Sequence, residues 1–141
     1  MMDKSKTTKI IDAMIAKDYF SQWLGIERID EHEGYCKLKM QLRPEMCNGF
    51  EIIHGGVTFS FADSALAFAC NSSGKHAVSI ECSISHIKSL KAGENIFAIA
   101  ELQSLSNKIG IYHVRVEREN GELVALFKGT VFRKDKDWET D

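Results

Sequence analysis

The sequence predicts an α+β protein in which one apolar helix packs against a curved antiparallel sheet. The helix signal is residues 55–71, a segment that is apolar on almost every side. The sheet signal is a series of segments in which apolar and polar residues alternate, joined by short turns. An apolar helix needs cover on every side, and a curved sheet with one apolar face provides it.

The first third of the chain predicts two short helices followed by a hairpin. Apolar side chains of residues 10–17 share one helical face, and residues 19–24 continue as a second short helix, so we expect N-terminal helices over 8–24. Residues 26–33 and 35–42 then predict two strands that turn at Gly34.

The rest of the chain predicts a loop, the apolar helix and a meander of strands. Pro44 opens the loop, and Asn71-Ser-Ser-Gly74 is a strong stop signal for the helix. Asn120-Gly121 is a strong hairpin signal before the final strand. The strands are expected over residues 77–87, 95–105, 109–117 and 123–132, and the charged tail 134–141 is expected to fray.

Length and composition favour a single domain, residues 1–141, acting in the cytoplasm. The formal net charge of −2, from 18 basic and 20 acidic residues, offers no field for nucleic acid or an anionic membrane surface. No apolar run resembles a signal peptide or a membrane span. The four cysteines form no C-x-x-C pair and no Cys/His cluster with zinc spacing, so we interpret them as reduced thiols.

Asp63 is the only charged residue of the apolar helix, and it is the strongest candidate for chemistry. Buried aspartates are rare unless their charge is compensated. Helical spacing places Ser60, Asp63, Ser64 and Asn71 in one narrow polar stripe. The stripe could simply face water, but it lacks the Lys, Glu and Arg of an open helix face, so a cleft or a subunit interface suits it better.

His54-Gly55-Gly56 precedes this helix and is a candidate oxyanion site. Two glycines permit a sharp turn, and the first N–H groups of a helix lack intrahelical partners at the positive end of its dipole. Such groups hold anions or developing oxyanions. A plain tight turn explains the same residues, and a Gly-Gly pair alone does not separate the two interpretations.

Three further polar residues are weaker candidates. Asn48 could donate its amide to a carbonyl or hold a water, although turn formation is the commoner role of Asn-Gly. His54 could polarise a carbonyl or orient the loop, although a lone histidine is more often structural. Ser79 could reach substrate or water from its strand, although a satisfied strand-edge hydroxyl is the commoner role. The spacing of His54 and Asp63 does not favour a metal site, so we expect none.

The segment from Asn48 to Asn71 resembles the hotdog-fold acyl-CoA thioesterases, most nearly their phenylacetic-acid-degradation (PaaI-type) branch. That family has an Asn, a His-Gly-Gly turn and a central helix with Ala-Asp at this spacing. The similarity covers roughly residues 20–133. It continues through Ser79-Ile-Glu-Cys-Ser-Ile, Ala92-Gly93-Glu94, Tyr112 and Val124-Ala-Leu-Phe-Lys-Gly129. One departure is Leu90-Lys91, where relatives often have a proline.

The resemblance implies a hotdog fold: a long central helix wrapped by a curved antiparallel sheet of five to six strands. It also implies a homodimer, often paired into a homotetramer, with active sites at the dimer interface. One chain would contribute the His-Gly-Gly turn and the other the acidic helix residue. No cofactor is implied, because coenzyme A is part of the substrate.

The resemblance also assigns roles to individual residues. Asp63 would be the general base or nucleophile, and the N–H of Gly55 or Gly56 would stabilise the thioester oxyanion. Asn48 and His54 would position the carbonyl or water. Ser64 replaces the usual Thr, Ser79 matches a water-holding serine, and Phe59 is a candidate wall of an acyl pocket, although core packing explains it equally well.

The function implied is hydrolysis of acyl- or aryl-acyl-CoA, such as a phenylacetyl-CoA-like ester, to free acid and CoA. Two alternatives on the same fold are a hydratase or dehydratase and a non-catalytic acyl-CoA-binding regulator. The first pairs an acid with a histidine in another motif, and the second needs no helix carboxylate. Release of thiol from CoA esters separates the three.

Overall fold

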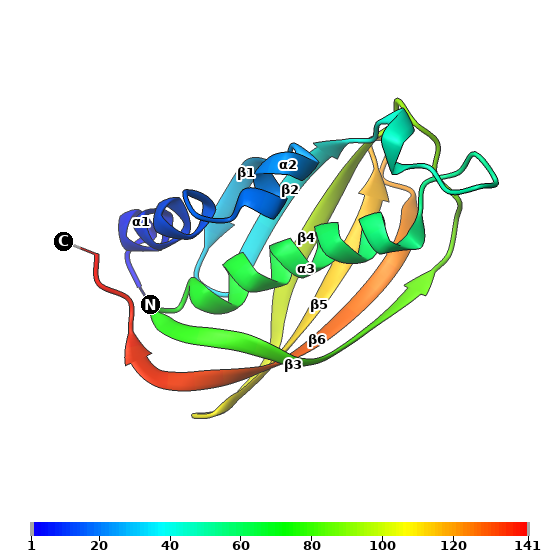
Figure 1. Ribbon diagram of the computed structural model, residues 1–141. Coiled ribbons are helices and arrows are strands. Elements are labelled where there is room, and N and C mark those ends of the chain that lie inside the picture. The colour runs from blue at the N-terminus through cyan, green and yellow to red at the C-terminus, as the bar shows by residue number, and fades with distance from the viewer. Residues whose placement is uncertain (1, 141) are drawn as a thin grey trace.

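The computed structural model describes residues 2–140. Its main feature is a six-stranded antiparallel sheet that curves around the helix α3 (Gly55–Asn71) (Figure 1). The strand order across the sheet is β1-β2-β4-β5-β6-β3, so β1 and β3 are its edges. The strands are β1 (Glu27–His32), β2 (Tyr35–Gln41), β3 (Lys75–His86), β4 (Asn95–Leu105), β5 (Ile109–Arg118) and β6 (Leu123–Asp137). The predicted α+β architecture is thereby confirmed.

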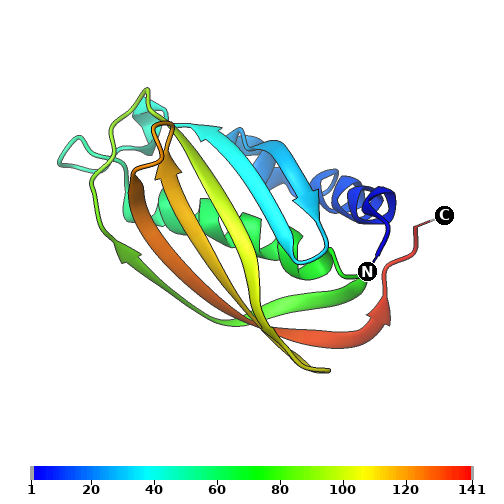
Figure 2. The same cartoon turned by 180° about the vertical axis from the view of Figure 1, so that it is seen from behind.

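The core lies between α3 and the concave face of the sheet. Figure 2 shows the molecule from the opposite side, with the strands in front of α3. Strand alternation sends every second residue inward in β2, in most of β5, and in the first parts of β4 and β6, where those side chains are buried. Phe61 and Phe68 of α3 are fully buried against them. Gly129 on β6 leaves room for Leu66, because a Cβ at that position would lie 2.4 Å from Leu66 Cδ2.

The N-terminal helices start earlier than the predicted range 8–24. The helix α1 covers Lys4–Ile15, and α2 covers Tyr19–Leu24 as expected. Asp3 caps α1 by accepting a hydrogen bond from Ser5 N at 3.0 Å. The first turn of α1 is polar and mostly exposed, so apolar periodicity did not reveal it.

The tail predicted to fray over 134–141 is largely a continuation of β6, which runs to Asp137. Its pairing with β3 extends to the register Lys75–Asp137, where the two side chains also form an ion pair of 2.9 Å. Trp138 N then donates to Gly74 O at 2.8 Å. The prediction was wrong because the end of this strand is exposed and charged, so it carries no apolar alternation. Asp141 lies outside the described residues.

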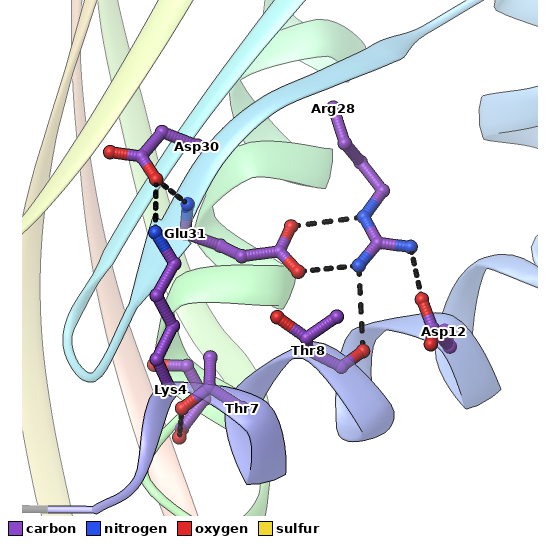
Figure 3. A network of polar contacts seen from close by, with 8 residues as sticks. Lys4, Thr7, Thr8, Asp12, Arg28, Asp30 and Glu31 are labelled. Carbon is purple, nitrogen blue, oxygen red and sulfur yellow. Dashed lines mark hydrogen bonds and ion pairs between the residues drawn. The ribbon is translucent and has the colours of Figure 1, made fainter.

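A polar network fastens α1 to β1 (Figure 3). Arg28 forms a two-point pair with the buried Glu31, donates to Asp12 on α1 at 2.6 Å, and donates to Thr8 O at 3.4 Å. Lys4 donates to Asp30 at 2.9 Å. This attachment places α1 beside the C-terminal half of α3, where Met14 packs against the core.

No helix among residues 2–140 is long and apolar enough to cross a membrane.

Candidate active site

The loop before α3 is a small closed turn that orients Asn48. Asn48 N donates to Ile52 O at 2.8 Å, and its side-chain Oδ1 accepts from Phe50 N at 2.9 Å. The amide oxygen is therefore used by the turn. The Nδ2 group remains as a donor, and Asn48 lines a cavity.

His54 caps α3 with its side chain and thereby distinguishes the two glycines. Its Nδ1 accepts a hydrogen bond of 2.8 Å from Gly56 N, so the neutral ring carries its proton on Nε2. Val57 N is also engaged, by His54 O at 3.0 Å. The Gly55 N–H has no partner within residues 2–140. Of the two predicted oxyanion donors, Gly55 is the one without a partner in residues 2–140.

The Gly55 amide borders a cavity of about 310 Å³, which Asn48 and Thr58 also line. His86, at the end of β3, lies across it. A Cβ at Gly55 would be 3.1 Å from His86 Nε2, so a glycine here permits the close approach of the imidazole. Lys88 lines the same cavity and adds a positive charge at its rim.

Asp63 lies in a second cavity, of about 260 Å³, between α1, α3 and β3. Ser79 lines this cavity with it, so the structure brings these two predicted residues together. The other walls are mostly apolar: Met14, Leu66, Ala67, Cys70, Ala77 and Val78, together with the polar Asn71. Burial raises the pKa of the Asp63 carboxyl, and the nearby negative charge of Asp18 raises it further.

The remaining members of the polar stripe are engaged inside the chain. Ser64 is buried, and its hydroxyl lies 2.8 Å from that of Ser21. Ser60 donates to Gly56 O at 2.7 Å. Asn71 makes hydrogen bonds through both ends of its amide, to Ala67 O, Ala77 O, Ala77 N and the Trp138 indole. Asp63 is therefore the member of the stripe that faces a cavity without a hydrogen-bond partner in residues 2–140.

The phenylalanines of α3 do not form the wall of either cavity. Phe59 packs edge-to-face on Phe127, with ring centroids 5.2 Å apart, and Phe61 and Phe68 are core residues. Of the two interpretations of Phe59, the contacts are those of core packing.

The two cavities lie at different positions along α3 and share no lining residue. Gly55 begins the helix and Asp63 follows eight residues later, which separates them by about 12 Å along the axis at 1.5 Å per residue. One thioester carbonyl cannot contact both groups of the same chain. This geometry agrees with a site shared between two chains.

Two residues near these cavities were not singled out from the sequence. His86 is brought to Gly55 by the sheet, and Asp18 acts electrostatically on Asp63 from the start of α2. Asp18 had a usable signal, since an Asp directly before a helical segment is a favoured N-cap. His86 had none, because only tertiary packing brings it to α3.

Comparison with known proteins identifies the family. The family model described as the Thioesterase superfamily matches residues 50–125. A putative esterase of Archaeoglobus fulgidus is 38% identical over 92% of this chain and 84% of its own length. The acyl-coenzyme A thioesterase PaaI of Escherichia coli is 36% identical, over 86% of each chain.

Solved structures agree with this result. The structure of the E. coli PaaI protein superposes with a TM-score of 0.92 at 33% identity, covering 95% of this chain and 97% of that one. A mutant of PaaI from Thermus thermophilus gives 0.80 at 36% identity over 83% of this chain and 100% of its own. With the curved sheet, the central helix and the His-Gly-Gly turn described above, these matches show that the chain belongs to the thioesterase superfamily, as a PaaI-type thioester hydrolase with the hotdog fold.

Proposed function

We propose that this thioesterase hydrolyses acyl- or aryl-acyl-CoA to the free acid and CoA. The observation that carries the proposal is Asp63, a carboxylate without a hydrogen-bond partner in residues 2–140 that lines a mostly apolar cavity beside Ser79. An apolar cavity suits an acyl group, and an unpaired carboxylate at its wall suits the activation of water. The E. coli relative, named an acyl-coenzyme A thioesterase, supports CoA as the thiol.

The size of the Asp63 cavity favours an acyl group of one ring or a medium chain. Its volume is about 260 Å³. A dry apolar cavity of roughly 150 Å³ already holds benzene. A phenylacetyl-like group therefore fits this volume. The similarity to the phenylacetic acid degradation protein PaaI of Thermus thermophilus supports a place in that pathway.

The chemistry needs an oxyanion donor and a base on opposite sides of the thioester carbonyl. The Gly55 N–H stabilises the carbonyl oxygen as it becomes negative, and the Asn48 amide offers a second donor on the same cavity. Asp63 takes a proton from water while the water oxygen bonds to the carbonyl carbon, and the C–S bond then breaks to release CoA thiolate. Direct attack by Asp63, through a mixed anhydride that water opens, uses the same groups.

We propose that a second copy of the chain completes the site. The Gly55 amide and the Asp63 carboxylate of one chain are too far apart for one carbonyl, and β3 is an unpaired sheet edge. Antiparallel pairing of two β3 edges would join the sheets in a twofold dimer. Each of the two sites would then receive Gly55 from one chain and Asp63 from the other. A dimer of such dimers would give the proposed homotetramer.

A cytoplasmic location is part of the same proposal. CoA esters are intracellular metabolites, and the four cysteines of the chain are free thiols.

The test is release of free thiol from a panel of CoA esters that includes phenylacetyl-, short-chain and medium-chain acyl groups. We expect turnover with aryl- or medium-chain esters, detected by a thiol reagent and by mass of the acid. Binding of CoA esters without thiol release would instead identify a regulator. Addition of water to an enoyl-CoA with the thioester intact would identify a hydratase.

A further inference from the structure

A short chain of hydrogen bonds links the start of α2 to the residue beside Asp63. Asp18 Oδ2 lies 2.6 Å from Ser21 Oγ, and Ser21 Oγ lies 2.8 Å from Ser64 Oγ. Ser21 is fully buried and Ser64 is 8% exposed, so water cannot easily replace these partners. Asp18 also caps α2 by accepting from Ser21 N at 3.0 Å. The chain therefore fixes α2 against α3 next to the candidate base.

The hydrogen bonds of this chain have a definite direction. An ionised carboxylate only accepts, so Ser21 uses its single hydroxyl proton on Asp18. Ser64 must then donate its own proton to Ser21 Oγ. The Ser64 hydroxyl consequently has no proton left to donate to any other group.

Asp18 also interacts electrostatically with Asp63. The negative charge of Asp18 opposes ionisation of Asp63, adding to the effect of burial on the Asp63 pKa. The other titratable neighbours are two thiols, Cys70 on α3 and Cys82 on β3, and α1 contributes the uncharged Met14. Lys17 and His76 lie with Asp18 in the adjoining groove between α1 and the start of β3.

We propose that Asp18 is a positioning residue of the active site, which fixes the Ser64 hydroxyl through Ser21 and holds a second negative charge beside Asp63. The proposal rests on the thioesterase function above, in which Asp63 accepts a proton. A base that must work near neutral pH gains from a neighbour that raises its proton affinity. The hydrogen bonds of Ser21 also hold α2, and with it Asp18, against α3 at the residue that follows Asp63.

The decisive variant is Asp18→Asn, which keeps the shape and the helix cap but removes the charge. Its Nδ2 group can donate to Ser21 Oγ, so Ser21 would donate to Ser64 and the direction of the chain would reverse. The matched control is Asp3→Asn. Asp3 caps α1 with the same pattern, accepting from Ser5 N and Ser5 Oγ at 3.0 Å each, but it is exposed and contributes nothing to the charge around Asp63.

The first measurement is the pH dependence of kcat/KM for thiol release. We expect the acidic limb of Asp18→Asn to move to lower pH, because the loss of a like charge favours ionised Asp63, and the limb of Asp3→Asn to match the wild type. Ser21→Ala retains the charge and breaks the chain, so its limb should stay in place while kcat falls at least severalfold and KM holds. An acidic limb of Asp18→Asn at the wild-type pH would overturn the role of the Asp18 charge. An unchanged kcat for Ser21→Ala would overturn the positioning role of the hydrogen-bond chain.

The second measurement is independent of turnover. The Asp63 carboxyl carbon can be titrated by NMR in the whole protein without substrate. Its pKa should be lower in Asp18→Asn than in the wild type and in Asp3→Asn, and equal pKa values would refute the electrostatic role of Asp18. If the wild type released no thiol but this shift occurred, the substrate proposal would fail while the coupling of Asp18 to Asp63 stood.

Discussion

Asp63 is held where its ionised form is costly. Apolar walls surround it, the negative charge of Asp18 lies nearby, and no donor within residues 2–140 offsets these effects. A surface aspartate is a poor base near neutral pH because its proton affinity is low. The raised pKa of Asp63 brings it closer to that range, which is what general-base catalysis requires.

Asp63→Asn should lower kcat by about 10²–10⁴-fold, the usual contribution of a positioned acid or base. The amide keeps the shape of the side chain but cannot accept a proton from water. In the wild type, activity should be lost as pH falls through the raised pKa of Asp63, and steady-state thiol release across pH measures it. Asp135→Asn, an exposed carboxylate on β6, is the control. Wild-type turnover by Asp63→Asn would exclude Asp63 as the base.

The same carboxyl should make the fold less stable at neutral pH. Its pKa is higher in the folded chain than the ordinary 3.8, so the folded state binds the proton more tightly than the unfolded state. The free energy of unfolding therefore falls as pH rises from 3.8 to the raised value, and stays lower above it. Asp63→Asn should remove this dependence and raise Tm at pH 7 relative to the wild type, as calorimetry at several pH values would show. An unchanged Tm would contradict the burial cost.

At the scale of elements, the close packing of α3 on the sheet sets where Asp63 lies. The helix contacts β2, β3, β4, β5 and β6, so its axis and rotation are fixed from several sides. Gly129 on β6 is one point of closest approach, where Leu66 fills the space that a side chain would need. Leu66 also lines the Asp63 cavity, so a shift at this contact would reach the site.

Gly129→Ala should destabilise the protein by about 1–3 kcal/mol, because its Cβ would overlap a fully buried leucine. Denaturant unfolding with the oligomer concentration held constant measures the change. Gly49→Ala is the matched control. A Cβ there meets nothing within 4 Å, so an effect within about 0.5 kcal/mol is expected. Equal effects of both substitutions would show that the Leu66 contact is not tight.

At the scale of the whole molecule, the edge strand β3 is the surface on which the proposed dimer rests. It is an edge strand with most side chains exposed on both faces, including Val78 at 46% and Ile80 at 59%. Exposed apolar edge strands favour pairing with another chain. The register of β3 against β6 shifts between Ser79 and Glu81, so the regular stretch of residues 81–86 is the part of this edge best suited to pair. The Asp63 cavity opens beside this strand, at Val78 and Ser79, where a partner could complete it.

Mixed oligomers should recover activity that neither parent has. Asp63→Asn removes the base. Gly55→Pro removes the unpaired N–H at a first helical position that tolerates proline, and its ring also pushes the His86 imidazole away from the cavity. A dimer with one chain of each kind has one intact site and one doubly altered site. Random association gives half such dimers, so co-expression should restore about a quarter of wild-type turnover.

The controls for mixing are the separately expressed variants, each expected to lose at least about 10²-fold in kcat. Light scattering establishes that both still associate. If co-expressed chains remained as inactive as the parents while forming mixed dimers, the site would lie within one chain.

Local sequence patterns were sufficient for most of the fold. Alternation predicted β2, β4 and β5 to within one residue at each end, because their inner faces are apolar and their outer faces polar. The same criterion missed the end of β6 and the first turn of α1, where both faces are exposed and charged or polar. Apolar periodicity arises when one face of an element is buried, so it cannot reveal a helix or strand segment that has no buried face.

For the candidate site, the sequence predicted which residues belong to it but not how they are paired and arranged. The sequence singled out Asp63, Ser79, Asn48 and the His-Gly-Gly turn, because an acid in an apolar helix and glycines before it are local patterns. It could not show that the N–H of Gly56 is paired with His54 while that of Gly55 has no partner within residues 2–140. Nor could it show that Ser64 and Asn71 are engaged inside the chain.

By itself, the sequence determined the α+β class, the apolar central helix and the carboxylate that this helix carries. Each of those properties follows from residue spacing within individual segments of the chain. Only the tertiary structure decided which donors remain unpaired, that Asp18 acts on Asp63, and that the two halves of the site lie apart in one chain. The physical reason is that hydrogen-bond pairing, burial and charge proximity arise between segments distant in sequence, so each depends on how the helices and sheet pack.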